Sequence, residues 1–515
     1  MMVKRAKIIV LAAVLAALPL GAAFAGGGGQ KASGKADAFV KPAETVTIRI
    51  GTNWSPERDV NYRDANGNPG MSAELLAART AAEKSVLEKY NVKFEWYQYP
   101  GSGRASEAIL PSVMAGAPVV DMTRVTGWEG DSSAQGLLLG QNVLQPIDDY
   151  AALFLDDPES RWMLWGKVYN HYFFLTEQMR LGSDGNLAYN LSLLEKVPAL
   201  RENGVLQHPA KLFNEGKWTW TAFEDMLTKI KAYYDSNTPG TVPFWSNWRL
   251  SAAQAIHSNG GSIYGDAGIG ISSQETKDAV AYIERLISRG LLTDARVTPD
   301  AASAEIHGSN DLDAFNKGTS AFAQLQLFGG ALADLRARGE SVGVVPWPRP
   351  DTMAADDPKY QPLNETKDGW AFVRGIGAQK TELAVRAFKE YLAVEYATRA
   401  GSTRALDYLQ TDRGLRSYAA EYGYDVLHPT YGDDILKAMK AFPTTPNDYG
   451  RATGWMITWE FSILGDSIWK IKNTPAYSVN AEQFLPRIRS FMSDLQLSVD
   501  NGQPRERTVN ANTIR

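Results

Sequence analysis

Cysteine is missing from this chain of 515 residues. Its absence excludes disulfide bonds, thiolate metal sites, a cysteine nucleophile and the acylated cysteine that anchors many exported proteins to a membrane. Histidine is scarce as well. The five histidines, at positions 171, 208, 257, 307 and 428, are scattered and lack the close spacing of zinc sites. We therefore expect neither a metal nor a cofactor.

Net charge and long apolar runs are also limited. The 53 basic and 58 acidic residues leave a formal net charge of -5, so the chain offers no basic field to nucleic acid or to an anionic membrane. No apolar run after residue 20 approaches the ~20 residues that a membrane-spanning helix needs. We expect no nucleic-acid partner.

The N-terminus has the three parts of a removable export signal. Basic residues at positions 4, 5 and 7 precede the apolar run 8–20, and Ala23-Phe24-Ala25 forms a small-x-small cleavage site. We predict that residues 1–25 are removed and that the protein acts in the periplasm or outside the cell, without a lipid on cysteine. Residues 26–44, rich in Gly, Lys and Ala, are typical of a disordered leader.

Two short stretches imitate ligand-binding loops. Residues 29–36 match the spacing of a phosphate-binding loop, but Ala36 replaces the metal-binding Ser or Thr and no strand precedes them. Residues 59–70 place Asp and Asn at alternate positions, as calcium loops do, but no Glu stands twelfth from Asp64. We assign no nucleotide site and interpret the second stretch as a solvated turn, with calcium binding there left open.

The chain is too long for one domain. Even without the signal it far exceeds the ~250–300 residues at which a single hydrophobic core stops growing, so at least two domains are expected. Strand patterns at 46–50, 92–96 and 119–122 alternate with helical patterns from Ser72 and over 105–115. This βαβαβ order predicts a parallel sheet with helices on its faces, and ligands of such sheets bind beyond the carboxyl ends of the strands.

Residues 187–195 and 216–230 organise the rest of the chain. The first stretch is a strand pattern that ends at Asn190 and turns into a helix. In the second, apolar residues at helical spacing predict a helix, and Thr221 with Glu224 three residues on predicts a reciprocal cap. Further helices are expected over 146–172, after Ser272–Ser273, from Thr381, and in the tail 438–492.

The order of these segments resembles a known family. Tyr189-Asn190, then Leu193-Leu194-Glu195 and then Thr219-Trp220-Thr221-Ala222-Phe223, is similar to the extracellular solute-binding proteins of ABC importers, maltose-binding-protein-like, family 1. The similarity extends over most of the chain after the signal. Further segments of the same kind stand at 114–121, 259–261, 315–322, 342–348 and 369–373.

The resemblance implies a fold, a function and partners. The fold is α/β, a two-lobe periplasmic-binding-protein-like fold (type II) with discontinuous lobes joined by a hinge. Lobe 1 would comprise 45–180 plus 350–415, and lobe 2 would comprise 181–349 plus 416–512. The function is capture of a sugar or oligosaccharide between the lobes, without turnover, by a monomer that delivers it to the membrane subunits of an ABC importer.

A sugar site needs aromatic planes for the C–H faces of the rings and planar polar groups for the hydroxyls. Residues that follow predicted strands, or that the resemblance places near the ligand, are the candidates. The aromatic candidates are Trp54, Trp128, Trp245, Trp248 and Trp455, and the polar candidates are Arg124, Asp184 and Gln324.

Two other classes of protein stay open at this point. An exported glycoside-active enzyme needs only two carboxylates at a set separation, and the 58 acidic residues could supply such a pair. An oligopeptide-binding receptor shares the two-lobe plan and holds peptides by strand-like backbone pairing. The order of the family-like segments favours a binding protein over the enzyme, and the aromatic loops and the subgroup that the chain resembles favour a sugar over a peptide.

Overall fold

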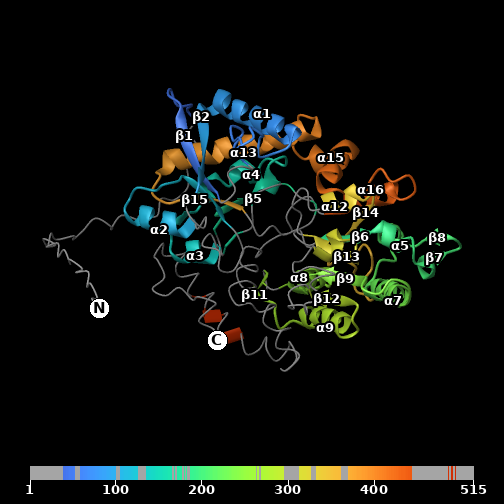
Figure 1. Ribbon diagram of the computed structural model, residues 1–515. Coiled ribbons are helices and arrows are strands. Elements are labelled where there is room, and N and C mark those ends of the chain that lie inside the picture. The colour runs from blue at the N-terminus through green and yellow to red at the C-terminus, as the bar shows by residue number, and fades with distance from the viewer. Residues whose placement is uncertain are drawn as a thin grey trace, which may run out of the picture. The chain divides into compact units, whose positions relative to one another are not determined.

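The protein is described here from a computed structural model (Figure 1). The structure describes residues 39–52, 58–99, 105–125, 135–164, 186–246, 248–262, 268–294, 313–325, 332–360 and 369–442, with short pieces between 167 and 181, at 264–265 and between 485 and 493. The predicted signal peptide, most of the predicted leader, the phosphate-loop-like stretch and nearly all of the predicted tail helix lie outside this range.

The first sheet has the strand order β2-β1-β3-β15-β4, and β5 also pairs with β15. Strand β1 runs parallel to β2 and β3, whereas β15 runs antiparallel to β3, β4 and β5. The strands are β1 (Val46–Thr52), β2 (Val92–Gln98), β3 (Met122–Val125), β4 (Leu144–Gln145), β5 (Phe174–Thr176) and β15 (Gly369–Val373).

Helices α1 (Ala73–Tyr90) and α13 (Ala378–Ala400) pack against each other beside this sheet, and α2 (Ala105–Met114) joins β2 to β3 (Figure 1). Helix α1 begins next to Ser72, as the sequence predicts, and Ser72 caps it, because its Oγ accepts from the Leu75 amide at 3.2 Å. Helix α13 begins three residues before Thr381, whose hydroxyl donates to the Gly377 carbonyl one turn earlier.

The second sheet has the order β12-β9-β13-β6-β14. Strand β9 runs parallel to β12 and β13, and β6 runs antiparallel to β13 and β14. The strands are β6 (Asn186–Asn190), β9 (Val242–Ser246), β12 (Leu292–Asp294), β13 (Ser320–Leu325) and β14 (Val342–Val345). Helices α7 (Trp220–Asn237), α8 (Trp248–Ser258), α9 (Gln274–Ser288) and α11 (Asp313–Asn316) accompany it.

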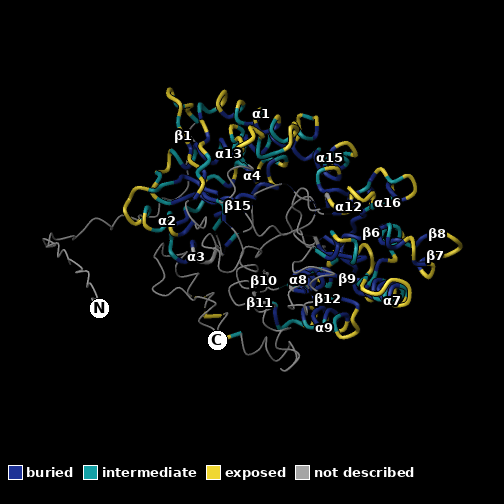
Figure 2. Tube along the Cα trace, viewed as in Figure 1, coloured by how far each residue is buried: buried dark blue, intermediate teal, exposed yellow. Residues whose placement is uncertain are grey.

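The core of the second sheet is built on aromatic rings that the helical spacing of α7 turns inward. Phe223 lies 5.7 Å from Phe244 of β9, 5.1 Å from Phe322 of β13 and 6.0 Å from Trp347, as measured between ring centroids. Met226, Leu227 and Ile230, predicted for the same face, are buried too. Figure 2 shows the central strands as buried segments, such as β6, β9 and β15, with exposed helix surfaces around them.

The strand Gly369–Val373 returns the chain to the first sheet after the chain has built the five strands of the second. This pairing places β15 between β3 and β4, far from its neighbours in sequence. The lobe boundaries stay a prediction. Pro42 and Ala43, within the predicted leader, accept hydrogen bonds from the Asn91 side chain at the start of β2.

Two local expectations were wrong. Residues 146–172 form no continuous helix, because helix α4 (Ala152–Leu155) is followed by a polar turn at Asp157. The Asp157 carboxylate accepts from the Glu159 amide and from the Ser160 hydroxyl. Pro158, which lacks an amide hydrogen, cannot continue a helix there. Helix α7 is capped by Thr219 rather than Thr221, since the Thr219 Oγ1 accepts from the Ala222 amide at 3.3 Å.

Asp64 closes the turn in the stretch that imitates a calcium loop. Its carboxylate accepts from the amides of Asn66 and Asn68, both at 2.8 Å. Such bonds within the loop are typical of an Asx turn. Among the helices that the structure describes, none is long and apolar enough to cross a membrane.

Candidate functional site

The carboxyl edge of the first sheet is built where β1, β2 and β3 end side by side. Tyr99, just beyond β2, crosses Gly51 of β1, where any side chain would collide with the phenol. Its hydroxyl lies 2.7 Å from the Thr123 Oγ1 in β3. Both side chains are buried, and burial raises the pKa of Tyr99, so this phenol stays neutral at ordinary pH.

Arg124 and Trp370 face each other in register across β3 and β15 at this edge. Arg124 is half-buried, whereas Trp370 is fully buried and packs edge-on against Trp96 at 5.9 Å. The guanidinium of Arg58 stands 5.6 Å from the centre of the Trp370 ring, within the range of a cation–π contact. This edge therefore places a cation beside a buried aromatic ring.

The carboxyl edge of the second sheet gathers neutral polar side chains. Ser246 ends β9 and Gln324 lies one residue before the end of β13; both are fully buried. The Gln324 Oε1 accepts from the Ser246 Oγ at 3.2 Å and from the Ser251 Oγ of α8 at 2.7 Å. Asn186 starts the antiparallel strand β6 beside them and donates to the Leu181 carbonyl at 2.6 Å.

The predicted site residues fall into three groups. Arg124 of β3 and Gln324 of β13 each lie one residue before the end of their strand, and their contact with a ligand stays a prediction. Trp245 and Trp248 are 0 % and 1 % exposed, and Trp245 packs against Ala314 of α11, so their contact with a ligand stays a prediction. The remaining four, Trp54, Trp128, Asp184 and Trp455, lie outside the described residues.

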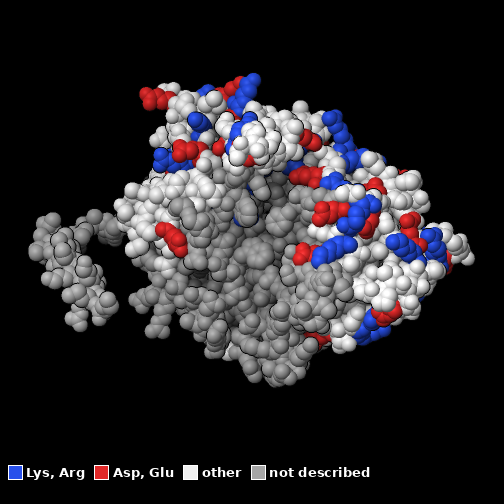
Figure 3. Space-filling model, in the orientation of Figure 1, with Lys and Arg blue, Asp and Glu red and all other residues white. Residues whose placement is uncertain are grey.

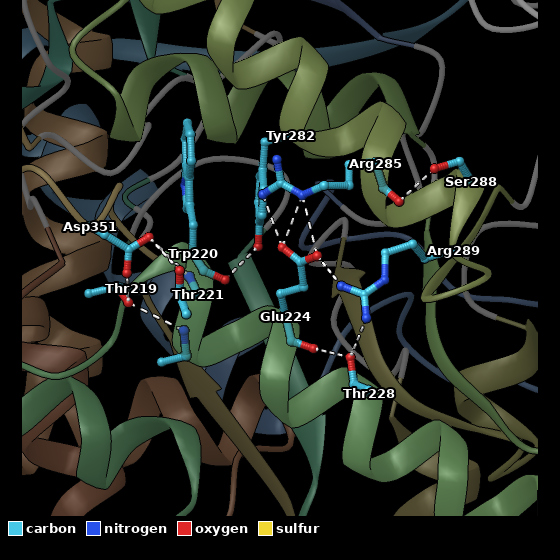
Figure 4. Close-up of polar contacts among 11 residues, drawn as sticks. Thr219, Trp220, Thr221, Glu224, Thr228, Tyr282, Arg285, Ser288, Arg289 and Asp351 are labelled. Carbon is cyan, nitrogen blue, oxygen red and sulfur yellow. Dashed lines mark hydrogen bonds and ion pairs between the residues drawn. The ribbon is translucent and has the colours of Figure 1, made fainter.

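The start of α7, on which the sequence interpretation centred, is a structural junction (Figure 4). Asp351, after β14, accepts from the hydroxyls of Thr219 and Thr221 at 2.6 and 2.8 Å. Burial raises the pKa of Asp351, but these hydrogen bonds outweigh it and the net shift is downward. The sequence predicts a cap between Thr221 and Glu224, but in the structure Thr221 pairs with the Asp351 carboxylate instead.

Glu224 instead joins α7 to α9 (Figure 4). Its carboxylate binds Arg285 at 3.0 Å and also binds Arg289. Beside this pair, Trp220 and Tyr282 stack with ring centroids 4.5 Å apart and planes 4° apart. The junction fixes the helix that supports β9 and so holds the second edge in place. No pattern in the sequence marked Asp351, Ser246 or Ser251 as part of this arrangement.

His208 is a buried titratable residue that lies beside Tyr189 of the second sheet. Its Nε2 lies 3.2 Å from the Asp434 Oδ2 of α16 (Gly432–Lys440), and its Nδ1 lies 3.3 Å from the Tyr189 hydroxyl. Burial lowers the pKa of His208 to about 4, although Asp434 opposes the shift; Lys211 and His428 lower it further.

We expect His208 to make stability depend on pH. The folded pKa lies below the ordinary 6.5, so the unfolded chain binds the proton first and folding weakens as pH falls from about 6.5 towards 4. Between pH 7 and pH 5 this group should remove about 2 kcal/mol of unfolding free energy. Urea unfolding at both pH values measures the loss. His208→Gln should remove that part of the dependence, and equal losses in parent and variant would contradict the assignment.

Charge on the described surface is mixed. Figure 3 shows basic and acidic side chains interspersed on the face drawn, which agrees with the formal net charge of -5. Among the described residues, no group of three or more His, Asp or Glu side chains is placed to hold a metal ion.

Comparison with solved structures identifies the fold. No protein-family model matches the sequence, and no curated protein matches it. The structure is similar to an ABC substrate-binding protein from Listeria monocytogenes solved in complex with cycloalternan, with a TM-score of 0.51 and 13% identity over 87% of this chain and 99% of that one. It is also similar to the sugar-binding protein MalE from Xanthomonas citri, with a TM-score of 0.50 and 13% identity over 88% and 99%.

This chain has the two-lobe solute-binding-protein fold. The predicted fold class, α/β and type II, is confirmed. In such a fold the two sheets form the cores of the two lobes, and ligands of parallel strands bind at their carboxyl ends. The edges at Thr123–Arg124 and at Ser246–Gln324 are therefore the candidate ligand-binding surfaces of the two lobes.

Proposed function

We propose that this protein captures a sugar or oligosaccharide between its lobes and delivers it to the membrane subunits of an ABC importer. The protein is exported after loss of residues 1–25, acts as a monomer and carries out no chemistry on its ligand. Binding shifts a hinge equilibrium towards a closed state, because the ligand contacts both lobes only when they close.

The neutral polar cluster at the second sheet's carboxyl edge carries this proposal. Serine and glutamine side chains donate to and accept from hydroxyl groups, and they do so without a charge that would need a counter-ion. Sugar rings present C–H faces that stack on aromatic side chains, which the proposed tryptophan contacts would supply. The solved relatives include a protein with bound cycloalternan and a sugar-binding protein, which supports the same ligand class here.

The ligand contacts proposed within this site are the residues that the sequence analysis selected. Arg124 and Gln324 supply polar groups from the two sheet edges. Trp245 comes from β9 and Trp248 from the start of α8. Both are buried, so the edge must open before a ligand reaches them. The others proposed are Trp54, Trp128, Asp184 and Trp455.

A ligand screen by thermal unfolding tests the function. A linear α-glucan such as maltotetraose and a cyclic α-glucan are added to the mature chain, with a tetrapeptide as the control. A ligand at a hundred times its Kd stabilises the folded state by about 2.7 kcal/mol, so we expect at least one glucan to raise Tm and the peptide to leave it unchanged.

The same mixtures separate binding from catalysis. After prolonged incubation the stabilising glucan should be recovered intact, because a binding protein holds its ligand without turnover. Cleaved glucan would favour the glycoside-active enzyme instead. Stabilisation by the peptide alone would favour the oligopeptide receptor.

A further inference from the structure

The amide of Gln324 is only half satisfied. Its Oε1 accepts from two serine hydroxyls, at 2.7 and 3.2 Å, but its buried Nε2 has no hydrogen-bond partner within the described part of the chain. The side chain is 0 % exposed, so a ligand reaches it only when this edge of the sheet opens. A buried polar atom without a partner destabilises the fold that contains it.

The unsatisfied end does not depend on which way the amide is turned. A serine hydroxyl donates or accepts, so Ser251 can pair with either end of the Gln324 amide, and the other end is then left without a partner. The group that completes the amide must therefore accept from a nitrogen or donate to an oxygen. A hydroxyl does both, whereas a carboxylate or phosphate oxygen only accepts.

The neighbouring strand favours an uncharged partner as well. Asp294 ends β12 directly opposite Ser246 of β9, and Asp294 is buried. A second carboxylate or a phosphate at this edge would share it with the Asp294 carboxylate, one strand beyond Ser246, and like charges repel each other in a region of low dielectric. A neutral hydroxyl carries no such penalty.

We propose that Gln324 contacts the ligand and recognises one of its uncharged hydroxyl groups, and that Ser251 and Ser246 are positioning residues that orient the Gln324 amide towards it. This inference rests on the proposed function and names the chemistry that the second sheet edge selects. The two serines hold one end of the amide by hydrogen bonds from β9 and α8, which leaves the other end for the ligand.

Gln324→Met tests the contact because methionine keeps the volume and removes the amide. Since the amide carries an unsatisfied buried atom, the variant should keep the Tm of the parent within a few degrees or exceed it. Its affinity for the stabilising glucan, measured by titration calorimetry, should fall about ten- to a hundredfold. A glutamine that only supports the fold would give the reverse: a lower Tm and unchanged affinity.

Monodeoxy analogues of the same glucan identify the hydroxyl. For one position the parent should lose affinity about tenfold or more when the hydroxyl is absent, and Gln324→Met should lose none, because the partner is already gone. Equal losses in parent and variant at every position would overturn the proposed contact.

The positioning role is tested by serine variants. Ser251→Ala should weaken binding several-fold and Ser251→Thr, which keeps the hydroxyl, should restore it. The matched control is Ser258→Ala, since Ser258 is another buried serine of α8, whose hydroxyl donates to the Ala255 carbonyl at 3.1 Å. This control should bind like the parent.

The outcomes separate the two levels of the proposal. If the parent binds a glucan and Gln324→Met binds it equally well, only the role of Gln324 is wrong. If the parent binds none of the probes, the proposed function fails and the inference falls with it.

Discussion

Replacing Glu395 by alanine is expected to lower the free energy of unfolding by about 3–5 kcal/mol. Glu395 of α13 is 2 % exposed and lies between two buried cations. Its Oε1 stands 3.4 Å from the Arg79 Nε of α1 and 3.6 Å from the Arg399 Nη1. Without the carboxylate, two guanidinium groups face each other in a region where water cannot screen them, and their repulsion adds to the desolvation cost.

The surroundings of Arg399 set the size of this effect. Arg399 also binds Glu421 and lies 4.4 Å from the Tyr408 ring centre, so it keeps partners when Glu395 is removed. Arg79 depends more on Glu395: burial lowers the pKa of Arg79, but Glu395 leads the interactions that raise it overall. The loss should therefore be felt mainly where α1 packs on α13.

Urea unfolding of the mature chain, followed by tryptophan fluorescence, measures the change. Glu395→Gln keeps the volume and isolates the loss of charge. The control is Glu88→Ala. Glu88 forms an exposed ion pair with Lys84 within helix α1, and such a pair contributes about 0–0.5 kcal/mol. If the Glu395 and Glu88 variants unfold at the same urea concentration, the buried cluster does not stabilise the fold.

The order of the elements could be read from the sequence because it rests on local patterns. Alternating residues in β1 and β2, the start of α1 near Ser72 and the apolar face of α7 each depend on neighbours within a few positions. The capping partner of Thr221 could not be read in this way. Asp351 lies 130 residues away in the sequence, and only the fold brings its carboxylate to the helix start.

The burial of Trp245 shows a second limit. Successive residues of a strand point to opposite faces, so Phe244 and Trp245 of β9 face opposite sides of the sheet. Phe244 is covered by Phe223 of α7, and Trp245 by Ala314 of α11. A central strand covered on both faces has no alternation that tells a core tryptophan from a ligand contact.

The polar cluster at the second edge was only partly predictable. Gln324 could be selected because it follows a family-like strand entry, but Ser246 and Ser251 are common residues with no pattern of their own. Their relation to Gln324 is a matter of register, since Ser251 is 73 residues away in the sequence. What the sequence predicts is the edge of the sheet, and the hydrogen bonds at that edge need the fold.

Phe223→Ala should destabilise the second lobe by about 3–5 kcal/mol, because it empties a site where aromatic rings from three other segments meet. Besides its contacts with Phe244, Phe322 and Trp347, the ring lies 5.3 Å from Trp218. The large indoles and phenyl rings around it cannot collapse to fill the cavity. Phe223→Leu leaves a smaller cavity and should cost less.

The measurement is the urea midpoint of the variant against Asp225→Ala, an exposed position of the same helix that should change the unfolding free energy by at most about 0.5 kcal/mol. Equal midpoints for the two would contradict the packing described. Phe223 also supports β9 and β13, whose ends carry Ser246 and Gln324. The variant should therefore bind the stabilising glucan more weakly than Asp225→Ala at a urea concentration where both are folded, because a loosened strand pair no longer fixes the Gln324 amide.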